Sequence, residues 1–155
     1  MMNTENLIWV NLGAQNPPES AKSWLTDDES LSKKLQQKFA NFSVNVLSQT
    51  QSQVHDNEVD LITPNTDCIV REVQLLGNQQ PVVFARSIIP ITNDTKDLLD
   101  IGCKPLGEIL FNSPKIIRGQ LQITNAGDIW GRRSTFIIGD TQLLVSEFFL
   151  ENLYA

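Results

Sequence analysis

Two neighbouring segments of this chain alternate polar and hydrophobic side chains, and a short polar loop separates them. The segments are residues 68–76 and 81–89, and the loop is residues 77–80. Because successive side chains of a β-strand point to opposite faces, this period of two predicts a β-hairpin with one face turned to a core. An isolated hairpin is only marginally stable in water, so the chain must build a larger sheet around it.

Charged residues stand at hydrophobic positions of the alternating segments. Arg71 falls on the hydrophobic face of the first segment and Arg86 on that of the second. In a third segment, residues 141–150, Glu147 does the same with the opposite charge. The hydrophobic residues that share these faces are Ile69, Val73 and Leu75, then Val82, Phe84 and Ile88, and last Leu143, Val145 and Phe149. Charges are costly to remove from water unless they are paired or bound to a ligand, so the pattern predicts a pocket for a small anion.

The pattern alone leaves two interpretations of these charges open. Because Arg71 and Arg86 lie on neighbouring strands of the hairpin, we expect their side chains to converge on a carboxylate, which arginine binds through its planar fork. Alternatively, one or both pair with Glu147, Glu72 or a carboxylate at a strand end as structural ion pairs, which ordinary cores also contain. Glu147 is accordingly either a hydrogen-bond partner or acid/base for a substrate hydroxyl, or a counter-ion.

The other three arginines carry weaker signals. Arg132 and Arg133 are adjacent in a predicted strand and therefore face opposite ways, so at most one of them faces inward. Arg118 alternates with Gln120 and Gln122, and we expect it to face solvent.

Composition limits the partners of the chain. Its 155 residues carry a formal net charge of −6, which argues against nucleic acid or an anionic membrane as the main partner. The length predicts one domain over residues 1–155, and a hydrophobic fraction of 41% predicts a folded globular protein. We expect a monomer whose partner is a small molecule.

Cysteine and histidine are scarce. Cys68 and Cys103 are far apart in the sequence, which predicts two buried reduced thiols and a cytoplasmic protein. His55 is the only histidine, so neither a histidine-based metal site nor a Ser-His-Asp triad is expected. The sequence shows no signal peptide and no apolar run long enough to span a membrane.

Predicted helices open the chain and interrupt a predicted sheet. Residues 17–25 form a short helix, and Thr26 with Glu29 has the spacing of a capping box for a second helix that carries Leu31, Leu35 and Phe39. Further helical segments are expected at residues 93–99 and 105–111, and strands at residues 42–46, 68–76, 81–89, 117–123, 132–138 and 141–150. This order predicts an α+β protein with a single antiparallel sheet of about six strands.

Together these segments resemble the chorismate pyruvate-lyase family, whose members convert chorismate to 4-hydroxybenzoate and pyruvate. The resemblance runs from about Trp24 to the end of the chain, includes the early helix at residues 30–34, and rests on an ordered set of motifs. These motifs are Arg71-Glu-Val73, Phe84-Ala-Arg-Ser-Ile-Ile-Pro90, Lys104-Pro-Leu-Gly-Glu-Ile-Leu-Phe111, Trp130-Gly-Arg-Arg-Ser134 and Ser146-Glu-Phe-Phe-Leu150.

The resemblance implies roles for particular residues. Arg71 and Glu147 match an arginine and a glutamate that hold the product, and we expect these two to be the catalytic pair. Leu106 matches a leucine that binds through its backbone, and Leu31 stands where the family has a methionine. Arg86 is expected beside Arg71, because chorismate carries two carboxylates. No metal or cofactor is implied.

The resemblance also implies a fold in which helical flaps cover a buried ligand pocket. The helical hairpin around Thr26 would supply one flap and residues 93–111 the other. The same fold occurs in the effector-binding domains of some bacterial transcription regulators, so the alternative function is a non-catalytic binding module for a small molecule. A weaker alternative is a structural protein whose inward charges only pair. For the lyase, the implied pathway is quinone biosynthesis, including ubiquinone.

Overall fold

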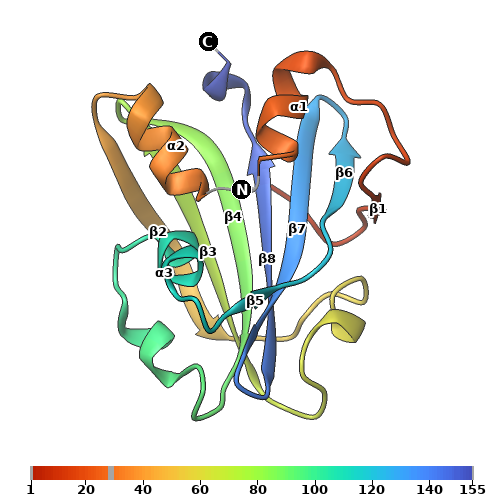
Figure 1. Cartoon of the computed structure of the whole chain (residues 1–155), viewed down its shortest axis with the longest axis vertical. Coiled ribbons are helices and arrows are strands. Elements are labelled where there is room, and N and C mark those ends of the chain that lie inside the picture. The colour runs from red at the N-terminus through yellow and green to blue at the C-terminus, as the bar shows by residue number, and fades with distance from the viewer. Residues whose placement is uncertain (1, 28–29, 155) are drawn as a thin grey trace.

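The computed structural model describes residues 2–27 and 30–154. Within these residues one antiparallel sheet runs in the order β1-β6-β7-β8-β4-β3-β2, and β5 pairs with β7 (Figure 1). The strands are β1 (Val10–Asn11), β2 (Phe42–Gln51), β3 (Cys68–Gly77), β4 (Gln80–Pro90), β5 (Ile117–Arg118), β6 (Gln122–Ala126), β7 (Ile129–Ile138) and β8 (Thr141–Phe149).

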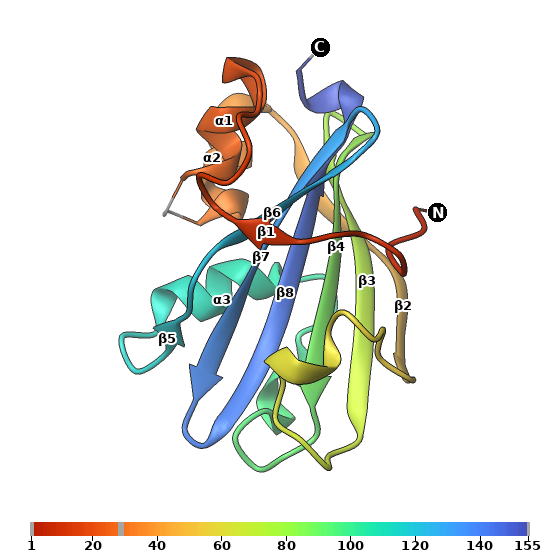
Figure 2. The ribbon, with the colours of Figure 1, turned by 90° about the vertical axis from the view of Figure 1, so that its right-hand side faces the viewer.

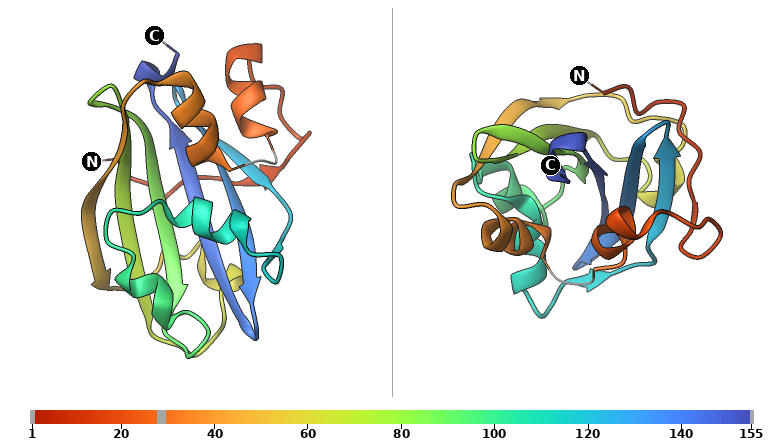
Figure 3. Two further views of the ribbon diagram at one scale, coloured as in Figure 1. Left: turned by 60° about the vertical axis from the view of Figure 1, so that its left-hand side comes forward. Right: turned by 90° about the horizontal axis from the view of Figure 1, so that it is seen from above.

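The helices are distributed unequally over the two faces of the sheet. One face, called the helical face below, is covered by α1 (Glu19–Leu25), α2 (Leu31–Lys38) and α3 (Leu106–Asn112) (Figures 2 and 3). The N-terminal segment and the 3₁₀ helix η1 (Val59–Leu61) cross the other face, called the rear face (Figure 2). Two more 3₁₀ helices are η2 (Lys96–Asp100) and η3 (Glu151–Leu153). None of the described helices is long and apolar enough to cross a membrane.

Both faces of the sheet carry buried hydrophobic side chains. On the helical face, Leu35 of α2 packs with Val73 and Val83, and Leu106 of α3 packs with Val145. On the rear face, Ile62 packs with strand residues that include Cys68, Val70, Ile88 and Leu144. The central strand β4 is therefore buried from Val82 to Pro90 without alternation. A charge that replaces a hydrophobic residue in such a strand can face either buried side.

The predicted α+β class with an antiparallel sheet is confirmed, and the strand count is eight where about six were expected. The two-residue strand β1 was not expected. The predicted strand at residues 117–123 is divided into β5 and β6, because the backbone leaves the ladder between Gly119 and Leu121. Residues 96–100, within the predicted helix at 93–99 and just beyond it, form 3₁₀ helix η2.

The predicted capping box is wrong in its capping residue. Thr26 is the C-cap of α1, where its backbone N–H donates to the carbonyl of Lys22. The N-cap of α2 is Ser30, whose hydroxyl accepts from the backbone N–H of Lys33 at 3.5 Å. Glu29, the other member of the predicted box, lies outside the described residues. The helical hairpin itself is present, with Leu31 and Leu35 buried along α2.

A β-bulge in the β3–β4 hairpin decides which arginines share a face. Next to the turn, Gly77 pairs with Gln80 and Leu76 with Pro81, a register that would place Arg71 opposite Arg86. Val82 is the extra residue of the bulge, since Leu75 pairs with Val83 and the register beyond is shifted by one. Arg71 therefore lies opposite Ser87, and Arg86 lies on the rear face opposite Glu72. The expectation that the two arginines converge is wrong.

Candidate active site

A small cavity lies between the helical face of the sheet and the starts of α2 and α3. Its volume is about 30 Å³. The sheet contributes one charged residue from β3 and one from β8, Arg71 and Glu147, to its wall. The other lining residues are Ser32, Val44, Val73, Leu75, Ala85, Ser87, Pro105, Leu106, Gly107 and Val145. The structure thus brings together three of the residues that the sequence singled out, which are Arg71, Leu106 and Glu147.

Arg71 is a buried cation that no carboxylate of the described residues neutralises. Its side chain is 2% exposed, and burial lowers its pKa. One guanidinium nitrogen donates to Oε1 of Gln49 at 2.8 Å, and another donates to the carbonyls of Gly102 and Lys104 at 2.9 and 3.2 Å. Neutral oxygens compensate a buried positive charge only partly, so the position favours an anion.

The same contacts attach the segment before α3 to the sheet. Gln49, which accepts from Arg71, also donates from its side chain to the carbonyl of Leu99 at 2.8 Å. Leu106 and Gly107 follow this segment as the first residues of α3 and line the cavity. A Cβ at Gly107 would meet no atom within 4 Å, so this glycine leaves open space beside the cavity rather than permitting a close contact.

Glu147 reaches the cavity from β8 and is held by Arg132 of β7, the residue directly opposite. Nε of Arg132 donates to Oε1 of Glu147 at 2.9 Å, and the side chains are 1% and 14% exposed. A second nitrogen of Arg132 donates to the carbonyls of Trp24 and Asp27 at the end of α1. The interpretation of Glu147 as a counter-ion is therefore correct. Its other oxygen, Oε2, accepts no hydrogen bond from the described residues, so the carboxylate can still receive a ligand hydroxyl.

A second cavity adjoins the first. It measures about 10 Å³ and shares Gly107, Val145 and Glu147 with the first cavity. Its other lining residues are Phe111, Arg118, Arg132, Ser134 and Phe136. Arg118 is half-buried there, so the expectation that it faces solvent is wrong. The break in the ladder after β5 explains the error, because Gln120 lies between the two strands and Gln122 belongs to β6.

Known proteins resemble this chain over most of its length. The family model described as chorismate lyase matches residues 3–155. The chain belongs to the chorismate lyase family. A probable chorismate pyruvate-lyase of Photobacterium profundum is 36% identical over 137 residues, covering 82% of this chain and 76% of the relative. The corresponding protein of Pseudoalteromonas atlantica is 33% identical, with coverages of 94% and 87%. The chorismate pyruvate-lyase of Photorhabdus laumondii is 28% identical, with coverages of 97% and 92%.

Arg86 lies in a different environment from the two helical-face cavities. Its Nε and one terminal nitrogen donate to both oxygens of Glu58 at 2.8 and 3.0 Å, and the other terminal nitrogen donates to Glu72 at 3.1 Å. Burial lowers the pKa of Arg86, but the hydrogen bonds and charges of the two glutamates outweigh burial and raise it. Arg86 thus forms a structural ion-pair network on the rear face and does not line the helical-face cavities.

Leu31 lies next to a residue of the first cavity without lining that cavity. It is the first residue of α2, is 4% exposed and packs in the core beneath this helix. The neighbouring Ser32 lines the cavity instead. A contact between Leu31 and a ligand remains a prediction.

Sequence reasoning missed several residues of the site. Gln49 lies beyond the strand that was predicted at residues 42–46, yet it belongs to the longer strand β2 and orients Arg71. Arg132 shares a strand face with the hydrophobic Phe136, and this shared face could have indicated that the Arg132 side chain points inward. Arg133 lies on the rear face, where it donates to Gln122 and to the carbonyl of Asn57 and stacks over Trp9 at 4.5 Å.

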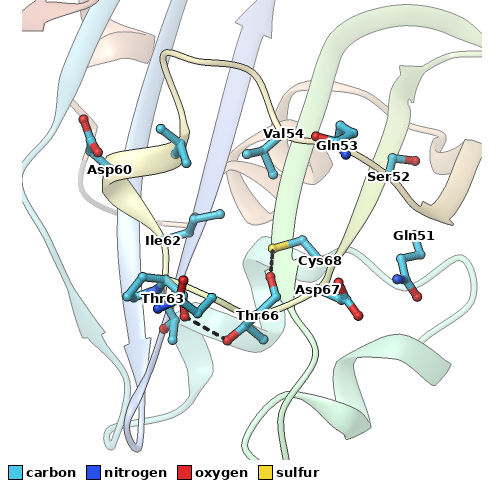
Figure 4. A pocket seen from close by; sticks show the side chains of 13 residues that line it. Gln51, Ser52, Gln53, Val54, Asp60, Ile62, Thr63, Thr66, Asp67 and Cys68 are labelled. Carbon is cyan, nitrogen blue, oxygen red and sulfur yellow. Dashed lines mark hydrogen bonds between the residues drawn. The ribbon is translucent and has the colours of Figure 1, made fainter.

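A much larger hollow lies elsewhere, on the rear face between η1 and the start of β3 (Figure 4). Its volume is about 530 Å³, and residues 51–54, 59–60 and 62–68 line it. The charged side chains in its wall are Asp60 and Asp67, and no lysine or arginine lines it. This hollow therefore disfavours an anion, and its size alone does not make it the site of the lyase family.

Proposed function

We propose that this protein is a chorismate pyruvate-lyase, which converts chorismate to 4-hydroxybenzoate and pyruvate. The observation that carries the proposal is Arg71, a buried cation without a carboxylate partner among the described residues, on the wall of the same cavity as Glu147. A ring with a carboxylate at one end and a hydroxyl at the other matches a cation and an acceptor placed in this way. Membership of the family supports the same function.

In the proposed complex the ring carboxylate binds Arg71 and the ring hydroxyl donates to Glu147. The ether C–O bond then breaks, and its electron pair leaves with the enolpyruvyl oxygen. The hydrogen on the neighbouring ring carbon, which carries the hydroxyl, is lost as a proton, and the ring becomes aromatic. The methylene carbon of the enolpyruvate takes up a proton, which gives pyruvate. The protein contributes orientation and charge placement, and its own residues form no covalent intermediate.

Arg132 and Gln49 act as positioning residues in this proposal. Arg132 fixes Glu147 through a single oxygen and leaves Oε2 for the hydroxyl. Gln49 fixes the guanidinium of Arg71 from the side of β2. Polar groups held in advance lose little freedom when the substrate binds, so more of the binding energy is available to orient the reacting bond.

Entry of the substrate requires movement of the helices. A cavity of about 30 Å³ holds one water molecule but no aromatic ring. Pro105 and the start of α3 form one side of the cavity, and the preceding segment 99–104 is hydrogen-bonded to the sheet by Arg71 and Gln49. We propose that α2 and α3, which pack against each other, separate to admit chorismate and to release the product.

The decisive experiment is incubation of the purified protein with chorismate, followed by measurement of both products. A chorismate lyase forms 4-hydroxybenzoate, whereas a non-catalytic binding module binds the aromatic acid and leaves chorismate intact.

We further propose that residues 1–155 act as one domain and that the protein is monomeric and cytoplasmic. We also propose that its product enters quinone biosynthesis, including that of ubiquinone. Restored quinone content in a bacterium that lacks its own chorismate lyase would support the pathway.

A further inference from the structure

Another cavity lies on the rear face of the sheet, where Leu61 of η1 covers part of β7. Its volume is about 140 Å³. Arg133 is the one charged residue that lines it, and none of the described side chains in its wall is acidic. A cavity with this charge favours an anion, in contrast to the larger rear-face hollow that Asp60 and Asp67 line.

The strand register explains why the lining side chains of this cavity meet. Arg133 and Thr135 are two residues apart in β7 and therefore point to the same face. Gln122 pairs with Arg133 across β6 and β7, and Leu144 pairs with Thr135 across β7 and β8. Directly paired residues share a face in an antiparallel sheet, so all four side chains lie on the rear face and line the cavity.

The guanidinium of Arg133 is buried, but its hydrogen bonding is incomplete. The side chain is 6% exposed. Its Nε donates to Oε1 of Gln122 at 2.9 Å, and its Nη1 donates to the carbonyl of Asn57 at 2.8 Å. Nη2 donates to none of the described residues. Since no fully buried side-chain nitrogen among these residues lacks a partner, Nη2 is accessible from outside the protein.

The charge of Arg133 is only partly compensated. Its two hydrogen-bond acceptors are neutral, and the ring of Trp9, 4.5 Å from the guanidinium carbon, restricts the group without neutralising it. Burial lowers the pKa of Arg133 to about 10, against the opposing charge of Glu58, so the group stays charged at neutral pH. Both oxygens of Glu58 accept from Arg86 instead. An anion in the cavity would compensate Arg133 further.

Two amides complete a set of donors around the cavity. Oε1 of Gln122 accepts from Arg133, which leaves the Nε2 amide group of Gln122 as a donor. Gln120 is exposed and adds a second side-chain amide to the wall. A planar carboxylate accepts hydrogen bonds from a guanidinium and from amides at the same time.

The size and charge of the cavity select a small anion. Its volume is several times the share of about 30 Å³ that one water molecule occupies in the liquid. A single arginine lines it, and the negative charge of Glu58 already acts on that arginine. One negative charge on the ligand is therefore matched, whereas a second would be repelled.

We propose that this rear-face cavity binds a small carboxylate with one negative charge, held by Arg133 and by the side-chain amides of Gln120 and Gln122. The site is separate from the two helical-face cavities, because Arg133 points to the opposite side of β7 from Arg132. It goes beyond the proposed lyase function and does not depend on it. Pyruvate is a carboxylate of this class and serves as the probe.

The test is an NMR titration of the purified full chain with pyruvate. The indole N–H of Trp9 and the side-chain amides of Gln120 and Gln122 should shift with one saturable Kd. Gln120→Glu should weaken this Kd at least about tenfold, because it places a carboxylate of the same shape in the wall. Gln37→Glu is the matched control, since it makes the same change at an exposed residue of α2 that does not line the cavity.

Arg133→Gln should weaken pyruvate binding by roughly 10-fold or more, because a hydrogen bond to a charged group is lost. If this variant does not fold, Gln120→Glu decides the question, because Gln120 is exposed and its replacement keeps the shape of the side chain. Gln37→Glu should keep the Kd of the wild type.

Four outcomes would overturn the inference. Absence of saturable shifts at Trp9, Gln120 and Gln122 would show that the cavity binds no such ligand. Shifts confined to residues of the helical-face cavities would place the carboxylate there instead. An unchanged Kd in Gln120→Glu would exclude this wall from the site, and tighter binding of inorganic phosphate than of pyruvate would exclude the singly charged class. None of these measurements involves turnover, so a protein that fails to consume chorismate would leave them unaffected.

Discussion

Arg132 donates from Nε to Oε1 of Glu147 at 2.9 Å, across the pairing of β7 and β8. This contact fixes the orientation of the one carboxylate that lines the two helical-face cavities, and it leaves the second oxygen of Glu147 without a partner among the described residues. The ion pair therefore serves the fold and the site together. A counter-ion and a ligand-binding group are compatible roles for one glutamate.

We predict that Glu147→Gln retains the fold and part of the product affinity while kcat falls. The amide keeps the shape and one acceptor oxygen but loses the charge, which is worth roughly a 10- to 150-fold change for a hydrogen bond to a charged group. Glu147→Ala should lose more of both binding and kcat. Steady-state kinetics with chorismate and titration with 4-hydroxybenzoate measure these quantities. Full kcat in Glu147→Gln across the pH range would reduce Glu147 to a structural counter-ion.

Arg71→Ala should weaken transition-state binding by about 2–5 kcal/mol, because a buried charge-assisted pair with the ring carboxylate is removed. Arg71→Lys should recover little of this, since lysine lacks the planar fork and cannot replace the bonds to Gln49 and Gly102 together. The values of kcat/KM for chorismate and of Kd for 4-hydroxybenzoate should both deteriorate. Wild-type kcat/KM in Arg71→Lys would contradict the bidentate role.

Leu31→Ala should weaken binding of 4-hydroxybenzoate with a smaller loss of stability than Leu35→Ala in the same helix. Leu35 is fully buried, and truncation of such a residue costs about 2–5 kcal/mol. Thermal unfolding and product titration of both variants separate the two effects. If Leu31→Ala lost as much stability as Leu35→Ala and kept its product affinity, Leu31 would be a core residue only.

Glu58→Ala should destabilise the protein by about 3 kcal/mol without a direct effect on the two helical-face cavities. The change removes the main partner of Arg86, and breaking a buried ion pair leaves an uncompensated charge. Asp60→Ala, which removes an exposed carboxylate nearby, is the control. Urea unfolding measures the loss, and activity of the folded fraction should be retained. A loss of kcat/KM larger than the loss of folded protein would connect the rear face to the site.

In the native protein, a thiol reagent should label Cys103 quickly and Cys68 only after unfolding. Cys68 is buried as predicted, with 5% exposed, whereas Cys103 is exposed, so the prediction of a buried thiol is wrong for Cys103. Burial, followed by the charges of Asp67 and Glu58, raises the pKa of Cys68 and keeps it as the unreactive thiol. Mass spectrometry of native and denatured samples counts the labels. Rapid double labelling of folded protein would contradict the burial of Cys68.

The sequence predicted the positions of the strands and helices well. It predicted less well which face of the sheet each charged side chain points to. Alternation located β3, β4 and β8, because strands of a half-buried sheet carry this period. It could not show that a bulge at Val82 shifts the register, since a bulge depends on local twist and packing more than on pattern. It also could not show that the rear face is buried. The hydrophobic residues that share a face with Arg86 were therefore interpreted as placing Arg86 at the site.

The errors at Arg118 and Gln49 have related causes. Arg118 belongs to a strand of two residues, which is too short for a period to be seen. Gln49 is polar and partly buried, and only its partner Arg71 reveals its function. In contrast, Arg71 and Glu147 were found correctly as inward charges, because each interrupts a hydrophobic face that the helices cover.

The most direct measurement is turnover of chorismate by purified protein that has been treated with a chelator and desalted, with both products quantified at each time point. Charge and hydrogen bonding from Arg71 and Glu147 should be sufficient for this elimination. We therefore predict that 4-hydroxybenzoate and pyruvate appear in equal amounts and at the same rate without added metal or cofactor. Unchanged chorismate, or activity that returns only after addition of a divalent ion, would contradict this mechanism.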